Sequence, residues 1–217
     1  MKIDSDFFSG RRLLIVTKHQ KETVIAPLLE EALGVQCVVA KDFDTDSLGT
    51  FSGEISRQED ALTTLRQKCL EGMKSEKFDL AVATEGSFGN HPTVFFAPAN
   101  DELIMLIDQK NHLEIVERVL SLETNFQSTE IHSIGDLYSF LDIVQFPSHG
   151  VIIKNAEKNW TQIEKGICDF ETLEKVYHEF TSSGMQCFIE TDMRAMHNPT
   201  RMKIIKEASL KLINKLH

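Results

Sequence analysis

Short apolar runs alternate with segments of helical periodicity along most of this chain, and this alternation restricts the fold more than any other feature of the sequence. The apolar runs predict strands, and the segments between them, in which apolar residues recur every three or four positions, predict helices. Strands that alternate with helices are typical of the α/β class. The predicted strands are residues 13–17, 35–40, 80–84, 103–108, 115–120, 151–154 and 187–190, and the predicted helices are residues 24–33, 59–74, 134–144, 171–181 and 201–216.

The expected sheet is mixed but largely parallel, and helices flank it. Residues 94–120 differ from the rest, because consecutive apolar runs without a helix between them favour antiparallel hairpins, with turns near Asn100 and Gln109. No repeat, low-complexity tract or linker divides the 217 residues, so we predict a single α/β domain over residues 1–217. The polar segment 124–133 is the best candidate for a boundary between lobes, and a two-lobed domain would divide there.

The charge balance excludes one class of partner. Asp and Glu number 33 against 23 Lys and Arg, and the net charge of −10 repels a phosphate backbone, so we expect no nucleic-acid polymer as a partner. The four cysteines form no CxxC pair and the first residues lack the pattern of a signal peptide, which favours reduced thiols and a cytoplasmic location over an extracellular disulfide protein. No apolar stretch is long enough to span a bilayer, so no membrane partner is expected, while a homodimer stays open.

The first polar cluster, TKHQKE, occupies the turn between the predicted strand 13–17 and the helix after it. In open α/β sheets ligands bind at the carboxyl ends of strands, and the N–H groups and dipole of a helix start favour an anion there. Thr17, Lys18, His19 and Lys21 are therefore candidate phosphate ligands, although the turn lacks the glycines of a Walker loop. The alternative is a solvated polar turn that carries two lysines.

An acidic segment, DFDTDSLGTFSGEISR, follows the predicted strand 35–40. Asp44 and Asp46 are candidate metal ligands, because closely spaced carboxylates are typical of Mg²⁺ and Ca²⁺ loops. An EF-hand is excluded, since Ser47 stands where that loop requires glycine. We therefore predict a site for a divalent cation that uses one or two of these carboxylates, against the alternative that these residues only cap helices and form turns.

The third cluster, TEGSFGNHP, ends the predicted strand 80–84. Glu85 is a candidate general base and metal ligand, and Gly86 and Ser87 are candidate ligand contacts because glycine lets a ligand approach the backbone. The GxSxG spacing of a serine-hydrolase nucleophile is absent. The alternative is a glycine-rich turn with a capping acid.

The fourth cluster, ETDMRAMHNPTR, again lies between a predicted strand and a helix. Asp192 is a candidate catalytic carboxylate, and Arg194 and Arg201 could hold a phosphate or carboxylate with their fork-shaped guanidinium groups. The alternative is an internal network of ion pairs. Candidates for proton transfer, each with a surface or hydrogen-bonded role as its alternative, are His19, His91 and His197.

All four clusters follow predicted strands, so a parallel sheet would bring them together at one edge. With the blocks TKHQKE, TDSLGTFSGEI, TEGSFG and ETDMRAMHNPTRM, the chain resembles an uncharacterised bacterial family of unknown function over most of its length. Many members of that family are expected to carry a cysteine-rich, zinc-ribbon-like tail after the last block. This sequence has a helix there instead, so no zinc is expected.

The order of the blocks is also similar to that of the inosine/xanthosine triphosphate pyrophosphatase superfamily. In those enzymes a Ser/Thr-x-Asn-x-x-Lys loop holds phosphates, and Thr17 with Lys21 or Lys18 matches it, with His19 in place of the asparagine. Glu85 matches the acid that follows a strand in those enzymes. The resemblance implies Mg²⁺-assisted attack of water on a nucleoside triphosphate, with release of pyrophosphate.

The leading hypothesis is a metal-dependent nucleotide phosphohydrolase-like protein that acts on a small-molecule ligand, with a nucleotide as the favoured class. One alternative is a noncatalytic small-molecule or nucleotide-binding protein that uses the same sheet edge. Another is a structural or partner-binding protein whose polar loops form only internal ion pairs. Whether the protein is an enzyme is therefore open at this stage.

Overall fold

The computed structural model describes residues 7–41 and 60–216. The chain divides into two compact units. The first unit contains Met1–Phe88, Asn100–Leu122 and Met202–His217, and the second contains Gly89–Ala99 and Glu123–Arg201. One boundary between the units therefore falls beside the polar segment 124–133.

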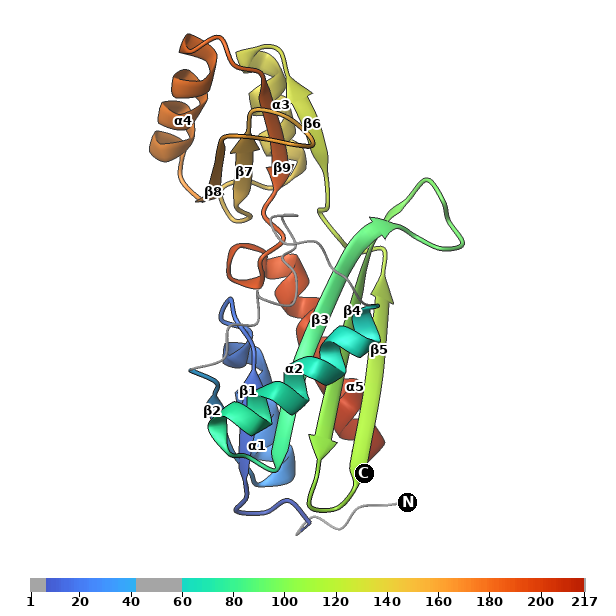
Figure 1. Cartoon of the computed structure of the whole chain (residues 1–217). Coiled ribbons are helices and arrows are strands. Elements are labelled where there is room, and N and C mark those ends of the chain that lie inside the picture. Colours follow the sequence, from blue (N-terminus) through green and yellow to red (C-terminus); the bar gives the residue numbers. More distant parts are fainter. Residues whose placement is uncertain (1–6, 42–59, 217) are drawn as a thin grey trace. The chain divides into compact units, whose positions relative to one another are not determined.

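The first unit is built on a five-stranded sheet with the strand order β2-β1-β3-β4-β5 (Figure 1). The central strand β1 is parallel to both of its neighbours, β2 and β3, whereas β4 and β5 form a long antiparallel hairpin. The bounds of the strands are β1 Arg12–Val16, β2 Gln36–Val39, β3 Leu80–Asn90, β4 Pro98–Asp108 and β5 Leu113–Ser121.

One face of this sheet packs against α2 (Ala61–Glu76), which begins where the side chain of Asp60 accepts hydrogen bonds from Leu62 N and Thr63 N. An apolar cluster on this face joins α2 to alternate residues of three strands. Its members are Leu65, Cys69 and Met73 of α2, Leu14 and Val16 of β1, Ala81 and Ala83 of β3, and Met105 and Ile107 of β4. Gly72 lets α2 approach β1 closely, because a Cβ at this position would lie 2.7 Å from Val16 Cγ2.

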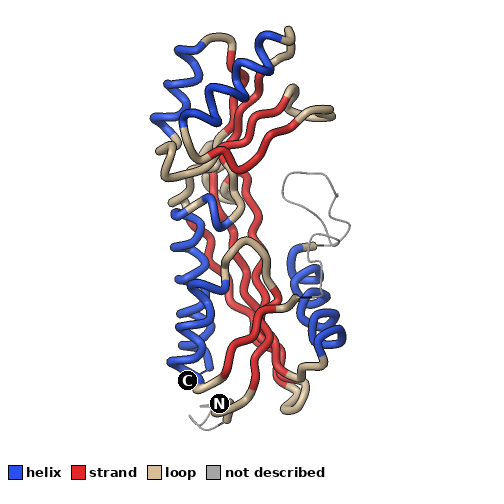
Figure 2. Tube along the Cα trace, turned by 90° about the vertical axis from the view of Figure 1, so that its left-hand side faces the viewer, coloured by secondary structure: helices blue, strands red, loops and turns tan. Residues whose placement is uncertain are grey.

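The intervening residues of each strand face the other side of the sheet, where α1 (Glu22–Leu33) and α5 (Pro199–Leu216) supply the cover. Helices α2 and α5 lie on opposite sides of the sheet (Figure 2). Lys215 near the end of α5 joins it to β5, since its Nζ lies 2.6 Å from Glu117 Oε1 and donates to the carbonyl of Val116.

The second unit has its own four-stranded sheet with the order β6-β9-β7-β8, and all three of its ladders are antiparallel. Two helices begin with side-chain caps, α3 at Ser133 and α4 at Asp169, and they share one apolar core with the sheet. The bounds are β6 Ser128–Ile131, α3 Ile134–Ile143, β7 Val151–Lys154, β8 Ile163–Ile167, α4 Phe170–Ser182, β9 Cys187–Thr191 and a 3₁₀ turn Ala195–His197.

The predicted α/β class with a mixed sheet is confirmed, and its parallel part is confined to β2, β1 and β3. The predicted turn near Gln109 lies between β4 and β5, but the turn predicted near Asn100 is wrong, because Asn100 lies inside β4 and pairs with Ser121. Tertiary pairing overrides the turn-like composition of this segment. None of the described helices is long and apolar enough to cross a membrane.

Candidate functional site

Two of the four polar clusters meet at one edge of the first sheet. In the parallel ladder Val16 of β1 pairs with Ala83 of β3, so Thr17 and Thr84 continue both strands at the same level. Parallel strands place their carboxyl ends on one side, which is where open sheets bind ligands. The sequence-based expectation of convergence therefore holds for the segments that follow Val16 and Ala83.

The loop that leads from β1 into α1 has an uncommon backbone. His19 and Gln20 have φ values of 67° and 60°, in the left-handed region that residues other than glycine rarely adopt. Helix α1 follows at Glu22, and the side chain of its N-cap residue, Lys21, makes no capping hydrogen bond to the first turn. Such conformations carry a cost and concentrate at ligand-binding sites, and an uncapped helix start offers N–H groups to an anion.

Lys21 ends this loop and is buried, with only 7% of its surface exposed. Its Nζ donates a 2.9 Å hydrogen bond to Thr84 Oγ1 and lies 3.8 Å from Glu102 Oε1. Thr84 and Glu102 are buried as well, and both lie on the face of the sheet away from α2. A lysine from the loop after β1 is thus fixed against β3 and β4.

Asn100 lies two residues before Glu102 on β4, and the two side chains therefore share a face of the strand. Asn100 is fully buried, and neither Oδ1 nor Nδ2 has a hydrogen-bond partner among the described residues. Buried amide groups are nearly always hydrogen-bonded, so this one is an exception that a bound molecule could explain.

Glu85, the next residue after Thr84, lies on the opposite face of β3, beneath α2. Its Oε2 is 2.5 Å from Nζ of Lys68 on α2, and the exposed fractions are 5% for Glu85 and 9% for Lys68. A buried carboxylate needs such a partner, because desolvation without compensation is costly. The edge therefore holds two buried lysines and two buried glutamates, divided between the two faces of the sheet.

The fourth cluster lies in the second unit and is internally satisfied. Asp192 is fully buried, and its carboxylate accepts hydrogen bonds from Nε and Nη2 of Arg194 and from the backbone N–H of Gly166. Asn198 accepts from the backbone N–H of Arg201, as expected for the cap of α5, and Arg201 Nη1 donates to the carbonyl of Met193. The cluster thus contains one internal ion pair, Asp192 with Arg194, surrounded by hydrogen bonds, which resembles the internal network considered as the alternative.

Cys168 and His197 lie beside this network, with 3.2 Å between the thiol Sγ and the ring Nδ1. Burial lowers the pKa of His197 and raises the pKa of Cys168. Both shifts favour the neutral forms, an uncharged thiol beside an uncharged imidazole, rather than a thiolate and imidazolium pair.

The sequence model of one protein family, described as a domain of unknown function (DUF6671), matches residues 68–217. The chain belongs to this family. The matched range begins at Lys68 and includes Glu85 and the whole second unit, whereas the loop after β1 precedes it. No curated protein matches the chain. Membership confirms the expectation of an uncharacterised family, and the similarity to the pyrophosphatase superfamily stays a prediction.

The structure changes the setting of several predicted site residues. Gly86 and Ser87 belong to β3, which runs on to Asn90, so the alternative considered for this cluster, a glycine-rich turn after Thr84, is not found. Pairing with β4 extends the strand past its apolar part. In the turn that follows β3, His91 Nδ1 accepts hydrogen bonds from the backbone N–H groups of Thr93 and Val94.

Asp44 and Asp46, the other predicted metal ligands, lie outside the described residues. Within residues 7–41 and 60–216, no group of three or more His, Cys, Asp or Glu side chains is arranged so that it could hold a metal ion.

Sequence reasoning missed Lys68, Asn100 and Glu102. The signal for Glu102 was its spacing of two and four residues from Ile104 and Leu106, which places a carboxylate on a buried strand face. Lys68 follows Leu65 by three positions and precedes Gly72 by four, and so lies on the buried face of α2.

Proposed function

We propose that this protein binds the phosphate groups of a nucleotide at the β1–β3 edge and hydrolyses it in a metal-dependent reaction. The observation that carries the proposal is the contact between Lys21, at the start of α1, and Thr84, the neighbour of Glu85 on β3. A cation from a left-handed loop and a carboxylate from the adjacent strand thus come to the same sheet edge, where α/β folds bind nucleotides.

Each part of the edge has a role in this proposal. The start of α1, together with Lys18 and His19, binds phosphate oxygens, and the buried amide of Asn100 on β4, which has no partner among the described residues, contacts the ligand. Glu85 acts as general base toward the attacking water. The substrate class is a nucleoside triphosphate and the product is pyrophosphate, as the resemblance to the inosine/xanthosine triphosphate pyrophosphatases implies.

The predicted Mg²⁺ fits this edge only in part. Mg²⁺ is commonly held by one or two carboxylates together with substrate phosphates, and Glu85 can supply one of them. When bound, the ion would neutralise phosphate charge that builds up during attack by water. The predicted catalytic role of Asp192 and the phosphate contacts of Arg194 and Arg201 stay predictions, since the proposal rests on residues of the first unit.

A second candidate function, noncatalytic nucleotide binding, is favoured by one specific contact. Lys68 already neutralises Glu85, and a carboxylate engaged in a 2.5 Å hydrogen bond to a lysine is a weaker base and a poorer metal ligand than a solvated one. A binding protein needs the phosphate contacts of the loop after β1 but no free carboxylate.

The deciding experiment measures pyrophosphate and phosphate release from canonical and deaminated nucleoside triphosphates with Mg²⁺ or Mn²⁺, together with the thermal shift on adding nucleotide. We compare the wild type with Glu85→Gln and with the control Glu71→Gln, an exposed acid on α2. Release that only Glu85→Gln abolishes supports hydrolysis. A thermal shift without release supports noncatalytic binding, and the absence of both contradicts each candidate function.

A further inference from the structure

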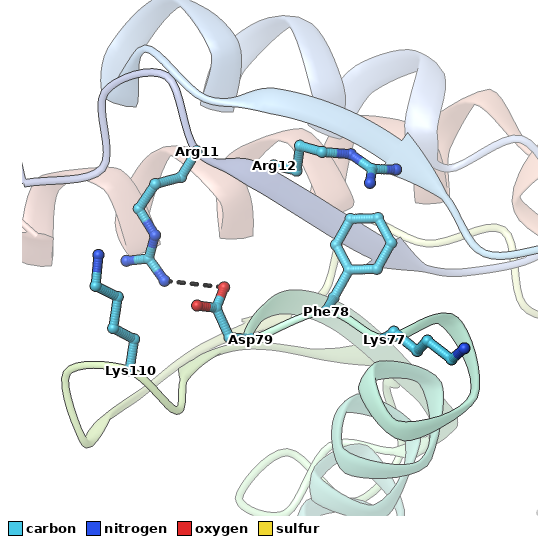
Figure 3. A pocket seen from close by; sticks show the side chains of 6 residues that line it. All are labelled: Arg11, Arg12, Lys77, Phe78, Asp79 and Lys110. Carbon is cyan, nitrogen blue, oxygen red and sulfur yellow. Dashed lines mark hydrogen bonds and ion pairs between the residues drawn. The ribbon is translucent and has the colours of Figure 1, made fainter.

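A second polar feature of the first unit lies at the other end of β1. A pocket of about 530 Å³ opens there (Figure 3). The five residues of β1 span about 16 Å, which separates this pocket from the loop after Val16. The pocket is lined by Arg11, Arg12, Lys77, Phe78, Asp79 and Lys110, and we call it the amino-end pocket.

Arg11 lines the pocket, and two carboxylates hold its side chain in place. Its Nη1 and Nη2 bind the two carboxylate oxygens of Asp108 at 2.5 and 2.8 Å, and Nη2 lies 3.2 Å from Asp79 Oδ1. The Asp108 carboxylate is fully buried, so it balances the charge of Arg11 inside the protein. Asp79, the acid in the lining, is also engaged by Arg11.

The other three cations in the lining have no acid partner among the described residues. Within the described parts of the chain no ion pair or hydrogen bond of the side chain joins Arg12, Lys77 or Lys110 to a carboxylate. Arg12 instead lies over the ring of Phe78, with its guanidinium carbon 4.5 Å from the ring centre, as Figure 3 shows. This cation–π contact holds the guanidinium at the pocket without using its N–H donors.

The backbone conformation of Lys77 is a second indication of a functional site. This residue caps the end of α2 with a φ of 58°, a left-handed position that glycine usually occupies. A lysine there carries a conformational cost, and strained residues of this kind concentrate at functional sites. The chain has a net charge of −10, so a pocket with three cations that lack an acid partner among the described residues is unusual for this acidic composition.

We propose that the amino-end pocket binds a phosphate-bearing small molecule. Its volume falls within the range of small-molecule sites. Arg12 supplies a bidentate donor for two phosphate oxygens, while Lys77 and Lys110 supply point charges. This site is separate from the β1–β3 edge, so it does not depend on the proposed function.

Isothermal titration of the full chain with inorganic pyrophosphate at low salt tests the proposal. Arg12→Gln/Lys110→Gln changes two exposed side chains and should leave the fold intact, which circular dichroism checks. We expect this variant to lose about tenfold or more in affinity, because two charge-assisted contacts are removed. The control Lys158→Gln, an exposed lysine of the second unit, should bind like the wild type.

A further variant, Lys18→Gln, separates this pocket from the β1–β3 edge. Binding that survives in Lys18→Gln and is lost in Arg12→Gln/Lys110→Gln supports the amino-end pocket. The reverse pattern places the anion at the β1–β3 edge and overturns the inference, as does equal binding by all variants. Citrate serves as a carboxylate comparison, and binding of citrate as tight as that of pyrophosphate would overturn the assignment to phosphate.

Discussion

Lys68 of α2 and Glu85 of β3 form a buried ion pair, with 2.5 Å between Nζ and Oε2. The pair joins the helix on one face of the first sheet to the strand that carries the proposed site. Glu85 is therefore both a structural partner of α2 and the carboxylate that the sequence predicts as a base. The structural role depends on the balance between the charges of Glu85 and Lys68. It can therefore be tested by itself, by replacing one or both of these side chains.

The first prediction concerns the stability that this pair provides. Lys68→Met leaves Glu85 buried without a partner and should lower the free energy of unfolding by about 3 to 5 kcal/mol. Lys68→Met/Glu85→Leu removes both charges and should recover most of that loss. Urea unfolding of the wild type, the two single variants and the double variant gives the coupling energy. If the double variant is no more stable than Lys68→Met, the unpaired charge of Glu85 is not the cause of the lost stability.

The second prediction concerns Asn100, whose buried amide has no hydrogen-bond partner among the described residues. Asn100→Val removes an unsatisfied polar group from a strand and should raise the free energy of unfolding by about 1 kcal/mol. Asn111 is the matched control, since its Nδ2 donates a 2.7 Å hydrogen bond to Asp108. Asn111→Ala should therefore lower stability by about 1 kcal/mol. Destabilisation by Asn100→Val in urea unfolding would mean that the amide does have a partner in solution.

The sequence predicts the elements whose signal is local. Strand β7 is a continuous apolar run, and helix α5 carries a long apolar stripe. Both patterns can be recognised from the local sequence alone. Strands β6 and β8 lack such a signal, because three of the four residues of β6 are exposed and one residue of β8 is buried. They are strands because they pair with β9 and β7.

The residues of the candidate site also divide into those with a local sequence signal and those without one. Thr17, Lys21 and Glu85 could be singled out from the sequence because they follow apolar runs, at the strand ends where open α/β sheets bind ligands. Lys68 and Glu102 could not be predicted in the same way, since a charged residue inside a helix or strand normally faces solvent. Only the tertiary arrangement shows that each of them is buried against an opposite charge.

The third prediction concerns the close approach of α2 to β1. In an exposed helix Gly→Ala is stabilising, but a Cβ at Gly72 would lie 2.7 Å from Val16 Cγ2. Gly72→Ala should therefore lower the free energy of unfolding by about 1 to 3 kcal/mol. Ser75→Ala, at an exposed position of the same helix, should raise it by a few tenths. In urea unfolding, Val16→Ala should reduce the cost of Gly72→Ala, and the absence of any such coupling would contradict the steric explanation.

The fourth prediction concerns the acid dependence of stability at Asp108. Burial opposes ionisation of this carboxyl, but the hydrogen bonds from Arg11 and Asn111 prevail, so its pKa lies below the usual value. Because the folded pKa is lowered, the ionised carboxylate contributes stability at pH values above the unfolded pKa of about 3.9. That contribution is lost as the pH falls through the folded pKa.

Asp108→Asn should therefore cost about 3 kcal/mol at pH 7, where it leaves Arg11 without its buried partner. The difference from the wild type should shrink when urea unfolding is repeated at pH values below about 4, because the carboxyl of the unfolded wild type then takes up a proton before that of the folded protein. Asp136→Asn is a useful comparison, since Asp136 is an exposed acid in the first turn of α3 and has a smaller expected effect. A stability difference for Asp108→Asn that stays constant from pH 7 to pH 3 would rule out the ionised pair with Arg11 as its cause.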